Sequence, residues 1–139
     1  MYRMRYLGID YGSKKVGLAF SDEEGTMGFP FDIVPNDARL SDALALLIVQ
    51  ENIGTIVIGE SINFDGNPNP IANPAHALGE ELTFRTGVPV VYEPEMMTTQ
   101  EARRDFEGVH SHKRGDVDAS AAALILTSYL TRDAHNRSV

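Results

Sequence analysis

Residues 8–22, GIDYGSKKVGLAFSD, set the architecture that the sequence predicts. Apolar, β-branched and aromatic residues dominate 5–10 and 14–21, on either side of residues 10–13. This pattern is typical of two antiparallel strands joined by a tight turn. Asp10 is then the last residue of the first strand, and two lysines follow it closely. A carboxylate packs poorly there, and it is well suited to hold a divalent metal ion against a phosphate.

Strands and helices alternate along the rest of the chain. The sequence predicts strands at 27–34, 53–59 and 88–92, helices over about 40–48 and 75–87, a helix from Thr98, and a last helix that carries Ala119 to Leu130. The continuous apolar run 53–59 is typical of a strand buried on both faces. Turns or loops are expected around Asp22, at 60–70 and at 107–115. The order β-β-β-α-β-α-β-α-α predicts an α/β domain, in which helices cover the faces of one mixed sheet.

The length predicts a single domain over residues 1–139, with a polar tail from about Thr131. The chain has no cysteine, which excludes disulfides, thiol catalysis and cysteine-based zinc sites and fits a reducing cytosol. No apolar run approaches the roughly 20 residues that span a membrane, and the N-terminus has no secretory signal pattern. A cytoplasmic protein without a membrane partner is therefore expected. The net charge of −8 opposes nonspecific binding to nucleic acids.

Three acidic residues are predicted at the ends of elements. Asp10 ends the first strand, Glu95 follows the last strand, and Asp118 lies in the first turn of the last helix. In an open α/β sheet, strand ends and the following helix starts can converge on one crevice. Three carboxylates would repel one another there unless a cation lay between them. Mg²⁺ or Mn²⁺ is the natural candidate because both prefer oxygen ligands, and two such ions can promote phosphodiester hydrolysis.

Each acid also has a purely structural interpretation. Asp10 can cap the hairpin turn, Glu95 can be an exposed loop residue, and Asp118 can stabilise the helix dipole. Each position alone is a weak signal, and only the combination of the three in this order of elements indicates a metal site.

Two basic pairs, Lys14-Lys15 and Lys113-Arg114, are predicted in turns that flank the acids. They could bind the phosphates of a nucleic acid in an otherwise acidic protein. Ordinary solvated surface is the alternative interpretation of both pairs.

Four groups of residues carry a resemblance to known proteins. They are Gly8 to Ala19 with Ser21-Asp22, Ile58-Gly59 with Asp65-Gly66, Glu95 with Thr98-Thr99, and Asp118-Ala119 with Ala121-Ala122 and Ile125-Leu126. Together they resemble the YqgF-type family of pre-16S rRNA nucleases and Holliday-junction-resolvase-like proteins, from about Met4 to Leu130. The resemblance implies a ribonuclease-H-like fold, a bacterial cytoplasmic setting and a metal-dependent nuclease role in maturing the 5′ end of 16S rRNA. It also implies that Asp10, Glu95 and Asp118 are the acidic site residues.

The sequence departs from this family's pattern at two places. The family usually has Asp-Glu-Arg before Leu-Thr-Thr, and this chain has Pro94-Glu95-Met96-Met97, so the glutamate remains while an acid and an arginine are absent. The family usually has Val-Gly-Leu-Pro where this chain has Ile58-Gly59-Glu60-Ser61. Arginine binds phosphate bidentately and methionine does not, and Glu60 adds negative charge. Both changes therefore predict weaker phosphate binding.

The leading hypothesis is a metal-dependent endonuclease that acts on precursor 16S rRNA. Asp10, Glu95 and Asp118 would hold two Mg²⁺ or Mn²⁺ ions, water would be the nucleophile, and Lys14 or Lys15 would steer the backbone. The nearest alternative is a resolvase of branched DNA, which needs a dimer; a monomer or weak homodimer is expected. A second class is ATP binding of the actin-like type, which requires two such domains. A third is a non-catalytic binding or ribosome-assembly protein with the same fold.

Overall fold

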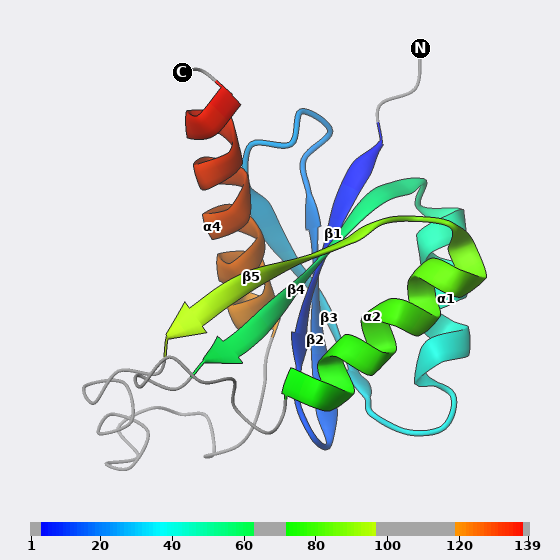
Figure 1. The fold of residues 1–139 in the computed structure, drawn as a ribbon. Helices are drawn as coiled ribbons and strands as arrows, with labels where there is room; N and C mark the ends of the chain where they lie inside the picture. The colour runs from blue at the N-terminus through cyan, green and yellow to red at the C-terminus, as the bar shows by residue number, and fades with distance from the viewer. Residues whose placement is uncertain (1–3, 63–71, 97–118, 138–139) are drawn as a thin grey trace.

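The computed structural model describes residues 4–62, 72–96 and 119–137 (Figure 1). These ranges contain a five-stranded sheet of order β3-β2-β1-β4-β5. The strands are β1 (Arg5–Tyr11), β2 (Lys15–Ser21), β3 (Gly28–Pro35), β4 (Ile53–Ile62) and β5 (Val90–Met96), and the helices are α1 (Leu40–Gln50), α2 (Ala72–Thr86) and α4 (Ala119–Arg137). No helix in the described ranges is long and apolar enough to cross a membrane.

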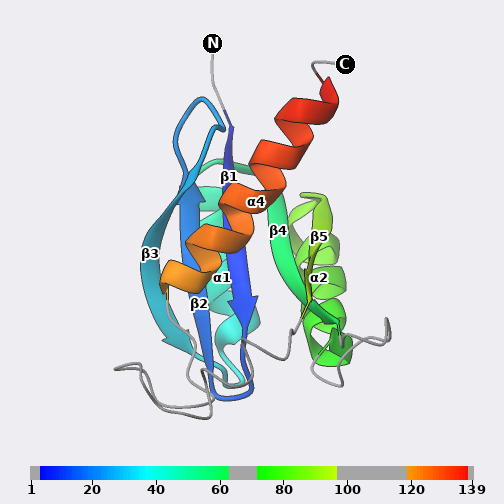
Figure 2. The ribbon, with the colours of Figure 1, turned by 90° about the vertical axis from the view of Figure 1, so that its left-hand side faces the viewer.

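The sheet is mixed. β1 pairs antiparallel with β2, and β2 with β3, whereas β1 pairs parallel with β4, and β4 with β5. α1 and α2 cover one face of the sheet, and α4 crosses the other face (Figures 1 and 2). The predicted hairpin of β1 and β2 and the predicted mixed sheet with helices on both faces are confirmed.

Strand alternation divides the apolar side chains between two cores. Leu7 and Ile9 of β1 belong to the core under α1 and α2, while Val57 of β4 packs in the core under α4. Ile56, Val57 and Ile58 are each 0% exposed. The prediction that this strand is buried on both faces is therefore confirmed.

Two glycines allow α4 to pack closely on the sheet. A Cβ atom on Gly8 of β1 would lie 2.9 Å from the Cβ atom of Leu126 and 3.0 Å from the carbonyl oxygen of Ala122. A Cβ atom on Gly28 of β3 would lie 2.9 Å from the carbonyl oxygen of Ala123. Such distances are shorter than ordinary carbon contacts, so any larger residue at these positions would push the helix away.

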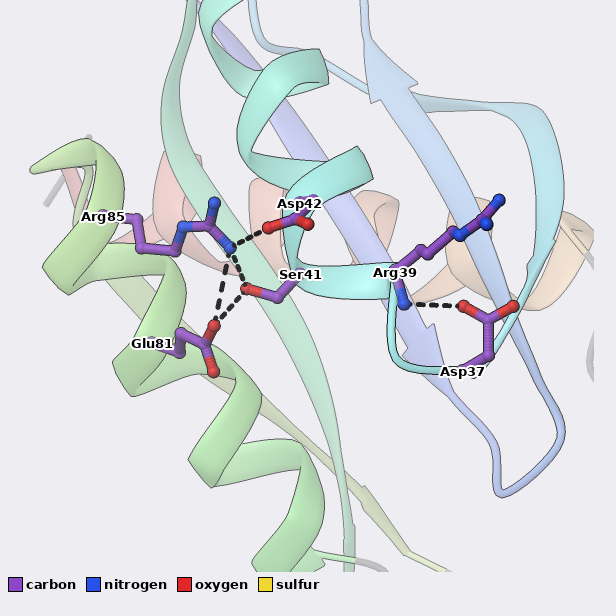
Figure 3. A network of polar contacts seen from close by, with 6 residues as sticks. All are labelled: Asp37, Arg39, Ser41, Asp42, Glu81 and Arg85. Carbon is purple, nitrogen blue, oxygen red and sulfur yellow. Dashed lines mark hydrogen bonds and ion pairs between the residues drawn. The ribbon is translucent and has the colours of Figure 1, made fainter.

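A polar network joins α1 to α2 on the outside of the molecule (Figure 3). The Ser41 hydroxyl donates to Glu81 Oε2 at 2.5 Å and accepts a hydrogen bond from Arg85 Nη1 at 2.9 Å. Arg85 Nη1 also lies 2.7 Å from Asp42 Oδ1. These contacts connect α1 to the face of α2 that carries Glu81 and Arg85.

Two predicted turn positions are confirmed by their geometry. The Asp22 carboxylate accepts hydrogen bonds from the backbone N–H groups of Thr26, at 2.7 Å, and Met27, at 3.3 Å. The hydrogen bond from the Thr26 side chain is the main cause of a pKa for Asp22 below its usual value. Gly87 follows α2 with a φ of 77°, the left-handed conformation that commonly ends a helix.

The boundaries of β4 and β5 differ from the prediction. Residues 60–62, predicted as the start of a loop, continue β4, and β5 extends to Met96. Glu95 pairs with Ser61 inside β5, so the prediction that it follows the last strand is wrong. Pairing between the two strands prolongs both, and Pro94 is tolerated because β5 is the edge strand of the described sheet. The predicted helix from Thr98 and loop at 107–115 lie outside the described residues.

Candidate functional site

Asp10 lies at the carboxyl end of β1, one residue before the strand ends, and is half-buried. Its backbone pairs with Gly17 of β2, and the preceding residue, Ile9, pairs with Ile58 of β4. Because side chains alternate along a strand, Asp10 shares the face of Gly8, which is the face that α4 covers. The carboxylate therefore lies at the end of the sheet where the parallel strands β1 and β4 have their carboxyl ends.

α4 runs antiparallel to β1 across this face. The rings of Tyr6 and Tyr129 are 6.2 Å apart, and the next residue of β1 on this face, Gly8, contacts Ala122 and Leu126. Residues nearer the carboxyl end of β1 therefore lie nearer the start of α4. The helix begins at Ala119, so its first turn lies toward the end of β1 that carries Asp10. Asp118 immediately precedes Ala119 in the chain and lies outside the described residues.

Glu95 is placed by its backbone only. It is two positions beyond Glu93 in β5 and pairs with Ser61 near the carboxyl end of β4. Asp10 and Glu95 thus belong to the ends of two parallel strands that both pair with β4. No group of three or more acidic, histidine or cysteine side chains suited to a metal ion occurs in the described part of the chain. Asp118 and the Glu95 side chain are outside that part.

Glu93 is a buried carboxylate that sequence reasoning missed. Its side chain is 7% exposed; Ser128 donates a hydrogen bond to Oε2 at 2.9 Å, and Arg132 Nη2 lies 2.6 Å from Oε1. The sequence did offer a signal for this ion pair: a glutamate stands between apolar residues of a strand, and the facing helix carries an arginine. Since both partners come from α4, this ion pair ties the second half of the helix to the edge strand.

The turn between β1 and β2 presents two cations. Lys14 in the turn and Lys15, the first residue of β2, are both exposed and close in sequence to Asp10. Asn36, which follows β3, holds the turn: its side chain donates to the Gly12 carbonyl at 2.7 Å, and its backbone N–H donates to the Lys14 carbonyl at 2.9 Å. The other predicted basic pair, Lys113 and Arg114, lies outside the described residues.

Comparison with known proteins identifies relatives over nearly the whole chain. Residues 4–132 match the family model "RuvX: Holliday junction resolvase". A protein of Anaeromyxobacter sp. (strain Fw109-5) named "Putative pre-16S rRNA nuclease" is 39% identical over 91% of this chain and 96% of its own length. A protein of the same name from Lactobacillus helveticus (strain DPC 4571) is 34% identical over 96% of this chain and 99% of its own length.

Solved structures share the fold at low sequence identity. T. thermophilus RuvC in complex with a Holliday junction substrate has a TM-score of 0.60 at 17% identity, with 95% of this chain and 96% of that chain covered. The Fowlpox virus resolvase, in complex with Holliday junction DNA, has a TM-score of 0.57 at 11% identity, with 93% and 98% covered. The predicted ribonuclease-H-like arrangement is thereby confirmed as a resolvase-like fold.

Proposed function

This chain belongs to the RuvX family, and we propose that it is a metal-dependent endonuclease that hydrolyses phosphodiester bonds during 5′-end maturation of precursor 16S rRNA. The observation that carries the proposal is the near-complete coverage of relatives named for that activity, at 32–39% identity. A resolvase-like fold with a half-buried aspartate at the carboxyl end of β1 supports it. The lack of cysteine fits the reducing cytoplasm in which such an RNA is processed.

The metal ligands in this proposal are Asp10, Glu95 and Asp118. Asp10 fits the role because its carboxylate offers oxygen ligands at a sheet edge toward which the first turn of α4 is directed. Two bound Mg²⁺ or Mn²⁺ ions would supply an activated water and neutralise the leaving oxygen. Holding three carboxylates in place without such a cation would be costly, because like charges repel.

The substrate contacts in this proposal are made by the two basic pairs. Lys14, in the turn that Asn36 holds, and Lys15, at the start of β2, are exposed, so their ammonium groups can contact the phosphate backbone beside Asp10. Lys113 and Arg114 are the second pair of cations in this proposal. These four cations would offset a net charge of −8 locally, where the backbone binds.

A Holliday-junction resolvase is the second candidate, because the family model carries that description. Resolution of a four-way junction requires two sites held across it, hence a dimer. A non-catalytic ribosome-assembly protein is the third candidate, since Met96 stands where the family usually has an arginine. The three candidates differ in substrate and in metal requirement, so one assay separates them.

The test is cleavage of a pre-16S 5′-leader RNA and of a four-way DNA junction, each with Mg²⁺, with Mn²⁺ and with chelator. We expect metal-dependent cleavage of the RNA that disappears in Asp10→Asn. Asp32→Asn, which removes the same charge from an exposed position of β3, should cleave like the wild type. Equal cleavage by the wild type and Asp10→Asn would refute the mechanism. Cleavage of the junction alone, by a dimer, would favour the resolvase, and RNA binding without cleavage would favour the assembly protein.

A further inference from the structure

A cavity of about 340 Å³ that opens widely to solvent lies between α2 and β5, on the face of the sheet opposite α4. α2 contributes residues spaced by three or four positions, and β5 contributes alternate residues, so one face of each element forms the wall. The lining residues are His76, Gly79, Glu80, Thr83, Val90 and Tyr92. The volume is within the range of pockets that bind small molecules, about 300–1,000 Å³. Nothing in the proposed metal site uses this cavity.

One wall of the cavity is a fixed aromatic platform. The His76 ring stacks on the Tyr92 ring, with centroids 4.1 Å apart and planes 21° from parallel. His76 Nε2 lies 2.6 Å from Glu60 Oε2, which holds the imidazole in place. Gly79 makes room for the tyrosine, because a Cβ atom there would lie 2.4 Å from the Tyr92 hydroxyl oxygen. A glycine inside a helix costs stability relative to alanine, and here it permits the close approach of this ring.

Glu80 supplies a charged group beside the aromatic rings, because its side chain is exposed at the cavity. Its carboxylate has no hydrogen bond or ion pair with any residue in the described ranges. Burial raises the pKa of Tyr92, and the negative charges of Glu80 and Glu60 raise it further. Glu80 thus brings a negative charge to the cavity wall, which would disfavour a phosphate and favour groups that donate hydrogen bonds.

We propose that this cavity binds one unpaired nucleobase of the substrate, of the kind that carries an exocyclic amino group. The inference rests on the proposed nuclease function and adds that the substrate is single-stranded next to the cut. Unpaired bases stack on aromatic side chains and present their Watson–Crick edge. A carboxylate accepts hydrogen bonds from base amino groups. Guanine fits best, since its N1–H and N2 amino group can donate together to the Glu80 carboxylate in charge-assisted hydrogen bonds.

The position of the cavity is compatible with the proposed site. Tyr92 pairs with Ile58, which pairs with Ile9, the residue before Asp10. The platform and the Asp10 carboxylate are thus at nearly the same level of the sheet, on opposite faces. β5 is the edge strand of the described sheet, and the proposal places one base in the cavity and the phosphates on the side of Lys14 and Lys15.

The test measures the binding of labelled single-stranded RNA by fluorescence anisotropy. A chelator is present so that no cleavage occurs. The probes are uridine-rich strands that carry one guanosine or one inosine, which differs only by lacking the N2 amino group. Glu80→Ala is compared with Glu81→Ala, which makes the same change at the next position of α2, where the side chain contacts Ser41 and faces α1 (Figure 3). Both variants lose the same charge and gain the same helix propensity, and Glu81→Ala also removes the hydrogen bond to Ser41 and the ion pair with Arg85.

We expect the wild type and Glu81→Ala to bind the guanosine strand about tenfold more tightly than the inosine strand, as for a hydrogen bond to a charged group. Glu80→Ala should bind both strands equally. No preference in the wild type, no binding of either strand, or the same preference in both variants would overturn the proposal. Cleavage of RNA without a guanosine preference would refute the cavity alone. A guanosine preference that depends on Glu80, in a protein that cleaves nothing, would refute the nuclease alone.

Discussion

Gly8→Ala should destabilise the protein by separating β1 from α4. The new methyl group would lie 2.9 Å from the Leu126 Cβ atom and 3.0 Å from the Ala122 carbonyl oxygen. Ordinary contacts between carbon atoms are about 3.5–4.0 Å. The helix must therefore move by several tenths of an ångström, because one of the two obstacles is backbone and cannot rotate away.

The expected loss follows from two opposing effects. Overpacking of a core costs about 1–3 kcal/mol, and replacing glycine by alanine recovers about 0.4–1 kcal/mol through the unfolded state. We expect a net loss of about 1–2 kcal/mol, which corresponds to a fall in Tm of about 3–10 °C for a domain of this size. Nuclease activity should fall as well, because the same displacement moves the first turn of α4 away from Asp10.

Urea and thermal unfolding, followed by circular dichroism, measure this loss. Leu124→Ala is the control on the same helix, since the Leu124 side chain is 71% exposed and packs against neither core. This variant should stay within about 0.5 kcal/mol of the wild type, as surface substitutions do. A Gly8→Ala protein as stable as the wild type would refute the close packing of α4 on β1.

Three further predictions test the surroundings of the site. Arg132→Ala should reduce the free energy of unfolding by about 2–3 kcal/mol in urea denaturation, because it leaves the Glu93 carboxylate buried without its cation; the half-exposed arginine keeps the loss below that of a fully buried pair. A loss below about 0.5 kcal/mol would show that the pair contributes nothing. Because the pKa of Tyr92 is raised above 10.0 by burial and nearby carboxylates, its neutral form favours folding. That contribution is complete below pH 10.0 and disappears as the pH rises through the pKa of the folded state. The difference in stability between the wild type and Tyr92→Phe should therefore be constant at neutral pH and should change in alkaline urea titrations; a constant difference throughout would contradict this. Lys14→Gln with Lys15→Gln should weaken RNA binding for all sequences alike and lower the slope of log K against log salt by about 1.4–1.8; an unchanged slope would exclude phosphate contacts by these lysines.

Much of the fold could be predicted because local patterns and tertiary packing agree. The apolar run of β4 is surrounded on both faces, so a continuous run predicted its burial correctly. The ends of β4 and β5 could not be predicted, because strand pairing extends past the apolar residues into Glu60 and Glu95. Pro94 lies inside β5, where proline is tolerated because β5 is the edge strand of the described sheet.

The candidate site was only partly accessible to sequence reasoning. Asp10 was found from its place beside a glycine turn, and its place at the carboxyl end of β1 agrees. Glu93 was missed because a buried ion pair depends on Arg132, which is 39 positions away and comes close only when α4 packs on the sheet. The pairing of Glu60 with His76 was missed for the same reason. In the structure the Glu60 carboxylate contacts the His76 ring, which stacks on Tyr92.

Mn²⁺ binding tests the central claim most directly. Calorimetric titration of Mn²⁺ into the wild type, Asp10→Asn and Asp32→Asn compares two variants with the same loss of charge, one at the sheet edge and one on exposed β3. The account predicts that the wild type and Asp32→Asn bind the ion alike and that Asp10→Asn loses most of the binding. Identical isotherms for all three proteins would contradict the assignment of Asp10 as a metal ligand.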